Sequence, residues 1–276
     1  MERKISSSSW IHSFAVVTVL AAGSAYGANE QWPQCKDGID NDIDGFTDSA
    51  DRDCSVEWLI PETFHSDVAA SVNGWTLING VGSWGWNKGK GAGGSSGEAR
   101  ATSYTAGTKR FYADLDLPRP LTFTEDWYAS GKMDFLANSA SDGGMVFGFF
   151  DANTSFAEQT LTVAGFILVN GELRIRVERR PGLEYIESSD MGLWTNADRI
   201  FKLVYYADGG GTGVGRLTGT LIKVSDGTKV VRSIDIPQSL TAGAQLNGFG
   251  FFAEDVFQGR STPFSWAVDD LSYGPK

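Results

Sequence analysis

Hydrophobic and polar residues alternate in short runs along most of the chain beyond residue 60, with turn-forming residues between the runs. In residues 199–206 the apolar positions Phe201, Leu203 and Tyr205 share one parity, and Lys202 lies on the other. A period of two residues is typical of a β-strand with one buried face. The sequence therefore predicts a strand here, with Phe201, Leu203 and Tyr205 on one face and Ile200, Lys202, Val204 and Tyr206 on the other.

The same pattern predicts further strands, and none of the apolar stripes continues at helical period beyond two turns. Strands are predicted at residues 127–136, 145–150, 161–169, 172–180, 200–206, 217–224, 229–236, 246–253 and 264–273. Asn170-Gly171 and the tract Ser225–Thr228 are strong turn signals and predict two hairpins. Many antiparallel strands without helices must bury one sheet against another, so we expect an all-β fold, an antiparallel jelly-roll β-sandwich.

Three segments of the sequence resemble the lectin and glucanase domains of the concanavalin A-like superfamily. They are the tract Tyr205–Gly211, the following GRLTGTLIKVSDGT, and the closing run FSWAVDDLSYG. The resemblance covers about residues 64–276 and implies a fold more than a function, because members bind polysaccharides, cleave them or act as adhesion and spacer modules.

The first residues have the three parts of an export signal. Arg3 and Lys4 give a positive start, residues 14–22 (FAVVTVLAA) are apolar, and Ala25-Tyr26-Gly27 offers small residues for cleavage. The apolar run is shorter than the roughly 20 residues that a transmembrane helix needs. We expect residues 1–27 to be a signal peptide and the mature protein to be secreted, extracellular or periplasmic, without a transmembrane segment. The alternative is an N-terminus that stays in the cytoplasm.

The segment CKDGIDNDIDGFTDSADRDC, residues 35–54, concentrates aspartates at regular intervals. Counted from Asp40, acids occupy positions 1, 3, 5, 9 and 12, and Gly45 occupies position 6. This is the spacing with which EF-hand loops wrap oxygen ligands around Ca²⁺, and the glycine permits the sharp turn. The flanking residues do not have helical patterns, so this is not an EF-hand domain.

The loop is instead similar to thrombospondin type 3 repeats, which bind calcium without helices. This resemblance implies the following ligands: the side chains of Asp40, Asp42, Asp44, Asp48 and Asp51, and the backbone carbonyl of Phe46. Position 12 is Asp instead of the usual Glu, so its shorter side chain reaches less far. Asp37 and Asp53 are left over for a second ion or for solvent. The alternative is an acidic linker without a metal.

Cys35 and Cys54 are the only cysteines and stand at the two ends of this loop. In an exported chain an isolated pair at this separation predicts one disulfide, whereas redox chemistry would favour C-x-x-C spacing. The sequence thus predicts a signal peptide at 1–27, a small disulfide-closed calcium loop at 28–57, and the sandwich at 58–276.

The charge of the whole chain limits its partners. Lys and Arg number 23 against 34 Asp and Glu, for a formal net charge of −11. A negative field repels nucleic acids and anionic lipid headgroups, so neither is expected as a partner.

The sequence does not identify catalytic residues. His65 is the sole histidine beyond the signal peptide, and its position near the start of the sandwich suits an ordinary surface residue. Retaining glucanases of the superfamily carry an E-x-D-x-x-E or E-x-D-x-E run, which this chain lacks. Glu125-Asp126 and Glu254-Asp255 are adjacent pairs whose side chains would point to opposite faces of a strand.

Two groups of residues are candidates for carbohydrate binding. Trp84 and Trp86 lie in a glycine-rich stretch and could stack on a sugar ring, or else seal the edge of the sandwich. In GELRIRVERR, Arg174, Arg176 and Glu178 share one strand face. Two arginines could hold a sugar carboxylate or sulfate, or the face could be solvated and self-neutralising.

These observations predict a secreted, calcium-binding protein whose lectin-like sandwich binds polysaccharide. The alternatives are a jelly-roll polysaccharide lyase or glycoside hydrolase with an unrecognised site, and a non-catalytic surface or adhesion module.

Overall fold

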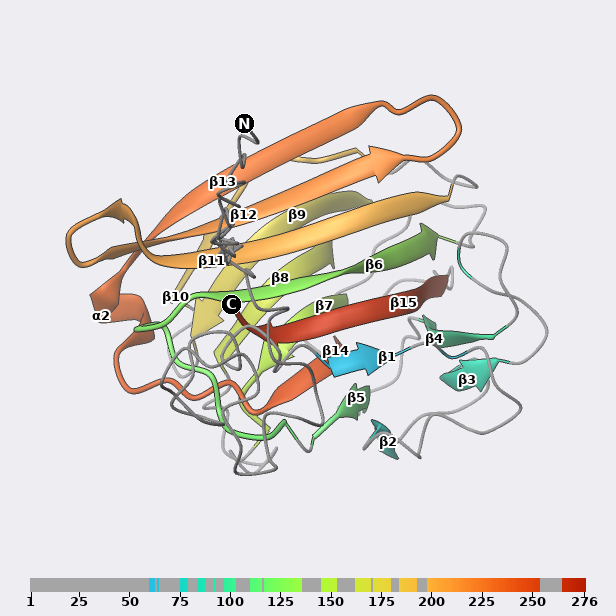
Figure 1. Cartoon of the computed structure of the whole chain (residues 1–276), viewed down its shortest axis with the longest axis horizontal. Coiled ribbons are helices and arrows are strands. Elements are labelled where there is room, and N and C mark those ends of the chain that lie inside the picture. The colour runs from blue at the N-terminus through green and yellow to red at the C-terminus, as the bar shows by residue number, and fades with distance from the viewer. Residues whose placement is uncertain are drawn as a thin grey trace, which may run out of the picture.

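Two antiparallel sheets form the framework of the protein (Figure 1). The computed structural model describes residues 60–62, 64, 75–78, 84–87, 92, 97–102, 110–115, 117–135, 145–152, 162–169, 171–179, 184–192, 198–253 and 265–276. The signal peptide and the boundary at residues 57 and 58 lie outside these residues.

Sheet A is the nearer layer in Figure 1. Its strands follow one another in the order β13 (Lys229–Pro237), β12 (Val214–Lys223), β11 (Arg199–Gly211), β6 (Trp127–Phe135), β15 (Ser265–Pro275), β4 (Glu98–Thr102) and β3 (Gly85–Asn87). The short β1 (Ile60–Glu62) pairs with β15.

Sheet B lies behind sheet A in the same view. Its strands follow the order β10 (Glu184–Glu187), β9 (Glu172–Arg179), β8 (Thr162–Val169), β7 (Met145–Phe150), β14 (Gly248–Ala253), β5 (Arg110–Asp114) and β2 (Trp75–Ile78). Two stacked antiparallel sheets with these crossovers confirm the predicted all-β jelly-roll sandwich.

The two predicted hairpins are confirmed: β8 pairs with β9 up to Val169 opposite Glu172, and β12 pairs with β13. In β11 the face that carries Phe201, Leu203 and Tyr205 is the buried one. Between β13 and β14, the described residues form a short helix that was not predicted, α2 (Gln238–Thr241). A single helical turn is too short to leave an apolar stripe in the sequence.

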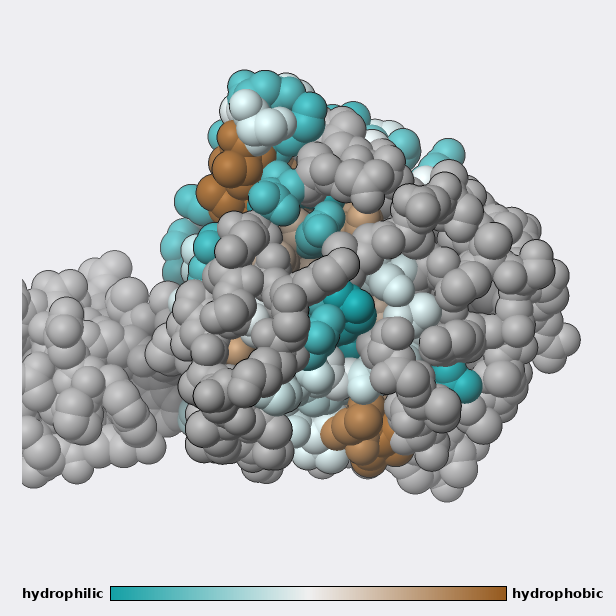
Figure 2. Space-filling model, turned by 90° about the vertical axis from the view of Figure 1, so that its right-hand side faces the viewer, coloured by the Kyte–Doolittle hydropathy of each residue, from teal (hydrophilic) through white to brown (hydrophobic). Residues whose placement is uncertain are grey.

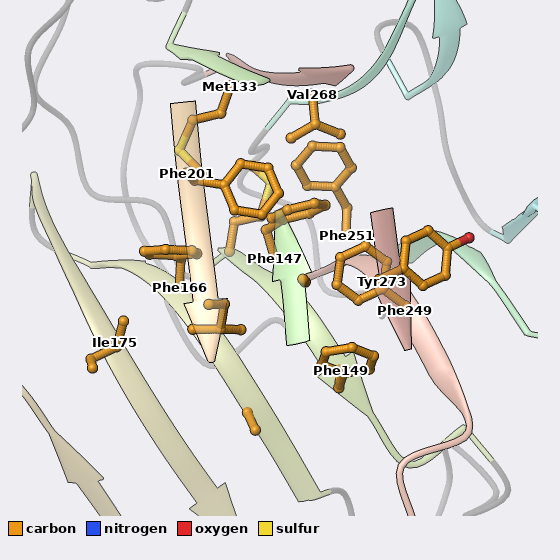
Figure 3. Packing of buried hydrophobic residues seen from close by; sticks show 14 of the residues in the cluster. Met133, Phe147, Phe149, Phe166, Ile175, Phe201, Phe249, Phe251, Val268 and Tyr273 are labelled. Carbon is orange, nitrogen blue, oxygen red and sulfur yellow. The ribbon is translucent and has the colours of Figure 1, made fainter. Parts of the chain in front are cut away.

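The core between the sheets consists largely of aromatic rings, as Figure 3 shows. Phe147 of sheet B meets Phe201 of sheet A edge-on with ring centroids 5.4 Å apart, and Phe249 stacks on Tyr273 at 4.1 Å. Such pairs contribute roughly 0.5–1.5 kcal/mol each beyond the burial of their surface. Packing of this kind fixes the relative position of the two layers.

A second hydrophobic cluster lies on the outer face of sheet B. Because Phe147 and Phe149 face the core, Val146 and Phe150 point to the opposite side of β7. The second cluster consists of Phe111, Ala113, Val146, Phe150, Val163, Ile167 and Phe252, all buried. The outer face of sheet B is therefore shielded from solvent over its middle strands.

Apolar side chains that do reach the surface are dispersed. Among the described residues, Leu77 and Ile78 of β2 and Val231 of β13 are exposed, at opposite edges of different sheets. Figure 2 shows hydrophobic atoms at two separate places on one side of the molecule, with hydrophilic atoms between them. None of the helices in the described part of the chain is long and apolar enough to cross a membrane.

Candidate carbohydrate site on strands β9 and β10

The polar face of β9 carries the arginines that the sequence singled out. Leu173, Ile175 and Val177 are fully buried toward the core, so Arg174 and Arg176 point to the outer face of sheet B. The alternation of GELRIRVERR thus has the predicted orientation. On its outer side β9 is bordered by β10, the edge strand of the sheet.

β10 contributes a carboxylate that holds both arginines. Glu187 lies opposite Arg176 in the β9–β10 register. Its Oε2 accepts hydrogen bonds from Nε and Nη2 of Arg176 at 2.9 and 2.5 Å, and its Oε1 pairs with Arg174. Arg176 also bonds Glu178 at 3.0 Å, and Arg174 pairs with Glu172. We call these five residues the β9–β10 charged cluster: Glu172, Arg174, Arg176, Glu178 and Glu187.

The charged cluster has one more negative than positive group. Its two guanidinium groups are paired with three carboxylates, and hydrogen bonding to Glu172 raises the pKa of Arg174 above its ordinary value. Since each arginine is engaged by carboxylates, an incoming sugar carboxylate or sulfate would have to displace them. The arginines and carboxylates of this strand face thus pair with one another. Arg176 and Glu178 are nearly buried, whereas the side chain of Glu172 is 42% exposed.

Tyr185 places an aromatic ring beside the charged cluster. It lies opposite Glu178 in the register, and the guanidinium carbon of Arg176 is 4.4 Å from its ring centroid. The Tyr185 side chain is nevertheless 48% exposed. An aromatic ring held by a cation–π contact and bordered by carboxylates offers an apolar face next to hydrogen-bond acceptors. The sequence analysis did not identify Tyr185, because its register with β9 depends on a separate strand.

A row of glycines crosses sheet B from the charged cluster. Arg176 pairs with Gly165, Gly165 with Gly148, and Gly148 with Gly250. A Cβ atom at Gly165 would lie 2.4 Å from the carbonyl oxygen of Phe147. These glycines are therefore required by the close approach of the neighbouring strands.

The two candidate tryptophans, Trp84 and Trp86, are buried to different degrees. Trp84 is only 5% exposed and donates from Nε1 to the carbonyl of Thr102 at 2.5 Å. Its ring is therefore part of the core, with little surface left for a sugar. Trp86 is half-buried and donates to the carbonyl of Phe64 at 3.1 Å. Sugar stacking by Trp86 stays a prediction.

Further charged groups lie within sheet A and at its edge. Glu98 is buried, pairs with Arg100 and accepts a 3.1 Å bond from Asn87; burial raises its pKa. Burial also raises the pKa of Asp134 and lowers that of Arg199 to about 10, and their charged groups lie 3.8 Å apart. Glu98 with Arg100, and Asp134 with Arg199, form ion pairs within the sheet, so these charges support the fold.

The adjacent acids Glu125 and Asp126 have structural partners. Glu125 accepts hydrogen bonds from Arg119, at 2.8 Å and 2.5 Å. Asp126 accepts one from the amide of Ala207 at 2.9 Å. The two carboxylates thus hold different segments, and they do not form an acid pair.

Several predicted site residues lie outside the described residues. These are the calcium ligands Asp40, Asp42, Asp44, Phe46, Asp48 and Asp51, and the cysteines Cys35 and Cys54. His65, which the sequence suggests to be an ordinary surface residue, also lies outside them. Within the described ranges, none of the His, Cys, Asp and Glu side chains form a group of three or more suited to a metal ion.

Comparison with known proteins gives the fold. No family model matches the sequence, and none of the curated proteins matches it either. Among solved structures, arcelin-5, a lectin-like defense protein from Phaseolus vulgaris, superimposes with a TM-score of 0.50 at 10% identity, over 79% of this chain and 98% of that one. A legume lectin-like domain from Entamoeba histolytica gives 0.49 at 10% identity over 79% and 97%. A carbohydrate esterase from a Shiga toxin-encoding bacteriophage gives 0.49 at 11% over the same shares. The likeness to arcelin-5 shows the fold alone, an antiparallel jelly-roll sandwich like that of this lectin-like protein.

Proposed function

We propose that this protein is an exported, calcium-binding protein of lectin type that binds a neutral polysaccharide through Tyr185 and the β9–β10 charged cluster. The observation that carries the proposal is the exposed Tyr185 ring, held over Arg176 and bordered by Glu178 and Glu187. The fold shared with lectin-like arcelin-5 supports the same class of function.

The chemistry of the cluster favours a neutral sugar. Carboxylate oxygens can accept hydrogen bonds from sugar hydroxyls while they stay paired with the two arginines. The extra negative charge opposes uronic acids and sulfated sugars. A tyrosine ring can cover the apolar face of a pyranose at the same time.

The calcium loop and the export signal belong to the same proposal. The spacing of Asp40, Asp42, Asp44, Asp48 and Asp51 supports one Ca²⁺ ahead of the sandwich. Its proposed role is to order the N-terminal segment, because the aspartates lie well before the sandwich strands in the sequence.

A glycan array that includes neutral, uronic-acid and sulfated polysaccharides tests the proposal, with quantitative binding then measured on the best neutral ligand. We expect Tyr185→Ala to weaken binding by at least about tenfold, since a buried aromatic contact typically contributes more than 1.4 kcal/mol. The matched control is Tyr206→Ala, because Tyr206 is 38% exposed and lies under a cation, Lys276, on the other sheet. That control should bind normally.

Three results would contradict the proposal. They are no binding to any neutral glycan, equal losses in both tyrosine variants, and a preference for anionic glycans. Release of new reducing or unsaturated ends from the bound polysaccharide would instead indicate a hydrolase or a lyase.

A further inference from the structure

A cavity of about 320 Å³ lies beside α2. In Figure 1, α2 is at one end of the sandwich. The cavity lies between the turn that precedes β6 and the connection from α2 to β14. The side chains that matter for its chemistry are Thr122, Phe123, Thr124, Gln238, Thr241 and Gln245. Its volume is at the lower end of the range for small-molecule sites, roughly 300–1,000 Å³. We call it the end pocket.

The two walls of the end pocket are tied together by backbone hydrogen bonds. Leu121 and Leu246 exchange reciprocal amide-to-carbonyl bonds, each 2.8 Å long. Thr122 follows the first of these residues and Gln245 precedes the second. On the α2 side, the amide of Ala244 donates to the carbonyl of Thr241 at 3.0 Å. The walls are therefore held in place before any ligand arrives, which lowers the entropy that binding must overcome.

In the turn that precedes β6, the threonine hydroxyl groups bond each other and the carboxylate of Glu125 has partners. Thr122 and Thr124 share a hydrogen bond of 2.8 Å between their Oγ1 atoms. The carboxylate of Glu125 accepts the amide of Thr122 at 2.9 Å and is also held by Arg119. Because Glu125 is held by both Arg119 and Thr122, its charge is partly compensated next to the pocket.

The floor of the end pocket is part of the aromatic core. Phe123 is nearly buried and meets Trp127 and Tyr205 edge-on, with centroids 5.9 and 5.2 Å away. The hydroxyl of Tyr205 donates to the carbonyl of Phe123 at 2.9 Å, and burial raises the pKa of Tyr205 to about 12. Tyr205 therefore stays protonated and keeps this floor fixed at ordinary pH.

The end pocket offers neutral donors and acceptors. Threonine hydroxyls and glutamine amides can both donate and accept hydrogen bonds, as sugar hydroxyls do. Of the described residues that line it, none has an ionisable side chain, so a charged ligand would find no counter-charge on them. From this chemistry we infer that the end pocket is a second carbohydrate site, which binds one neutral pyranose unit.

This inference adds a site to the proposed function and does not depend on Tyr185. The two sites lie near each other, because Arg179, opposite Glu184 at the start of β10, donates to the carbonyl of Ser239 in α2 at 3.3 Å. One polysaccharide could therefore contact both.

The test follows the side-chain amide signals of Gln238 and Gln245 by NMR while single monosaccharides are added to the full chain. The probes are glucose, galactose, mannose and N-acetylglucosamine, with glucuronic acid as the charged comparison. We expect at least one neutral sugar to shift both amide signals in a saturable way, with less effect from glucuronic acid.

Two variants localise the effect. Ala242 is exposed at the mouth and has φ −57°, so Ala242→Trp can block the pocket without backbone strain. Thr124→Val removes one hydroxyl with little change of shape. Ala242→Trp should weaken sugar binding by at least about tenfold, and Thr124→Val by about threefold. The control Val224→Trp, at an exposed position, should bind sugar normally.

The results separate the two sites. Tyr185→Ala should leave the monosaccharide shifts of Gln238 and Gln245 unchanged, and Ala242→Trp should leave polysaccharide binding at Tyr185 detectable. The inference is overturned if none of the neutral sugars shifts the amides, if Ala242→Trp binds normally, or if N-acetylglycinamide, a peptide-like probe, gives equal shifts.

Discussion

Glu187 shows how a single residue can hold a surface site together. It bonds two arginines at once, and its side chain is 18% exposed, whereas that of Glu172, which bonds only Arg174, is 42% exposed. When one carboxylate of a nearly buried ion pair is removed, the guanidinium group of its partner stays buried with its charge uncompensated, which lowers the stability of the fold.

We therefore expect Glu187→Gln to lower the free energy of unfolding by about 1–3 kcal/mol. Glu172→Gln, the matched control, should lower it by less than about 1 kcal/mol, because its pair is largely solvated. Urea denaturation of both variants at neutral pH measures the difference. Equal effects would mean that Glu187 does not organise the cluster.

Two glycines differ in why the residue is needed. Gly165 has no space for a Cβ atom, which would lie 2.4 Å from a backbone oxygen of β7. Gly227 has open space around its Cβ position, but its φ of +70° is in the left-handed region. The first glycine serves packing between strands, and the second serves only the turn between β12 and β13.

Alanine should separate these two causes. Gly165→Ala is expected to destabilise the protein by at least about 3 kcal/mol, since the obstacle is backbone that cannot move aside. Gly227→Ala should lower the free energy of unfolding by only about 1–2 kcal/mol, the strain of a left-handed alanine. Chemical denaturation compares them directly, and a larger effect at Gly227 would contradict this assignment.

At the scale of elements, the turn between β12 and β13 contains a small acid-sensitive network. Asp226 accepts hydrogen bonds from Lys223 at 2.6 Å and from the amide of Thr228 at 2.9 Å. These hydrogen bonds hold the pKa of Asp226 well below its ordinary value, and the bond from Lys223 has the largest effect. A lowered pKa means that the folded state prefers the charged form, so the stabilisation is present above about pH 4 and is lost as pH falls further.

Asp226→Ala should therefore have a lower Tm than the parent chain at pH 7, with a difference that shrinks as pH is lowered below about 4. Both Asp226 and its partner are on the surface, so added salt should also reduce the difference. Lys223→Ala combined with Asp226→Ala should be less than additive. A Tm difference that stays constant down to acid pH would contradict the role of this network.

Strand prediction succeeded where a run was continuously apolar or clearly alternating, and it failed at short strands that carry charges. The apolar β7 (Met145–Phe150) has the predicted bounds, and the alternating β6 is a strand over Trp127–Phe135, within the predicted 127–136. β4 and β5, with the sequences EARAT and RFYAD, were not predicted. In both strands charged and apolar residues are mixed, and most of their side chains are buried on either face. Their sequences therefore show neither an apolar run nor an alternation from which a strand could be predicted.

Only the part of the candidate site that lies on β9 could be predicted from the sequence. The faces of Arg174 and Arg176 follow from alternation within β9. Their partner Glu187 and the ring of Tyr185 come from β10, whose register cannot be read from either strand alone. The end pocket was not predicted at all, because its walls are more than a hundred residues apart in the sequence.

At the scale of the whole molecule, the proposed calcium loop precedes a sandwich with its own large core. If Asp40, Asp42, Asp44, Asp48 and Asp51 bind Ca²⁺, the folded chain gains stability with rising free calcium, by about 2.7 kcal/mol at a hundred times the Kd. Tm measured in calcium and in EDTA tests this, provided that the loop unfolds together with the sandwich.

Asp44→Asn should reduce the response to calcium, because it removes a charge at a proposed ligand. Asp37→Asn is the control, since Asp37 is not assigned to the first ion. Direct calcium titration by calorimetry covers the case in which the loop unfolds separately. No heat of binding in the parent chain at two different temperatures would contradict the site.

The contact of Phe123 with Trp127 also has an optical consequence. Trp127 is fully buried and stacks on Tyr205 with ring centroids 4.9 Å apart. A shielded indole emits at shorter wavelengths than a hydrated one, and a neighbouring phenol can transfer excitation to it. The difference spectrum between the parent chain and Trp127→Phe therefore isolates the emission of one indole, one ring away from the end pocket. That emission would report occupancy of the pocket without any added dye.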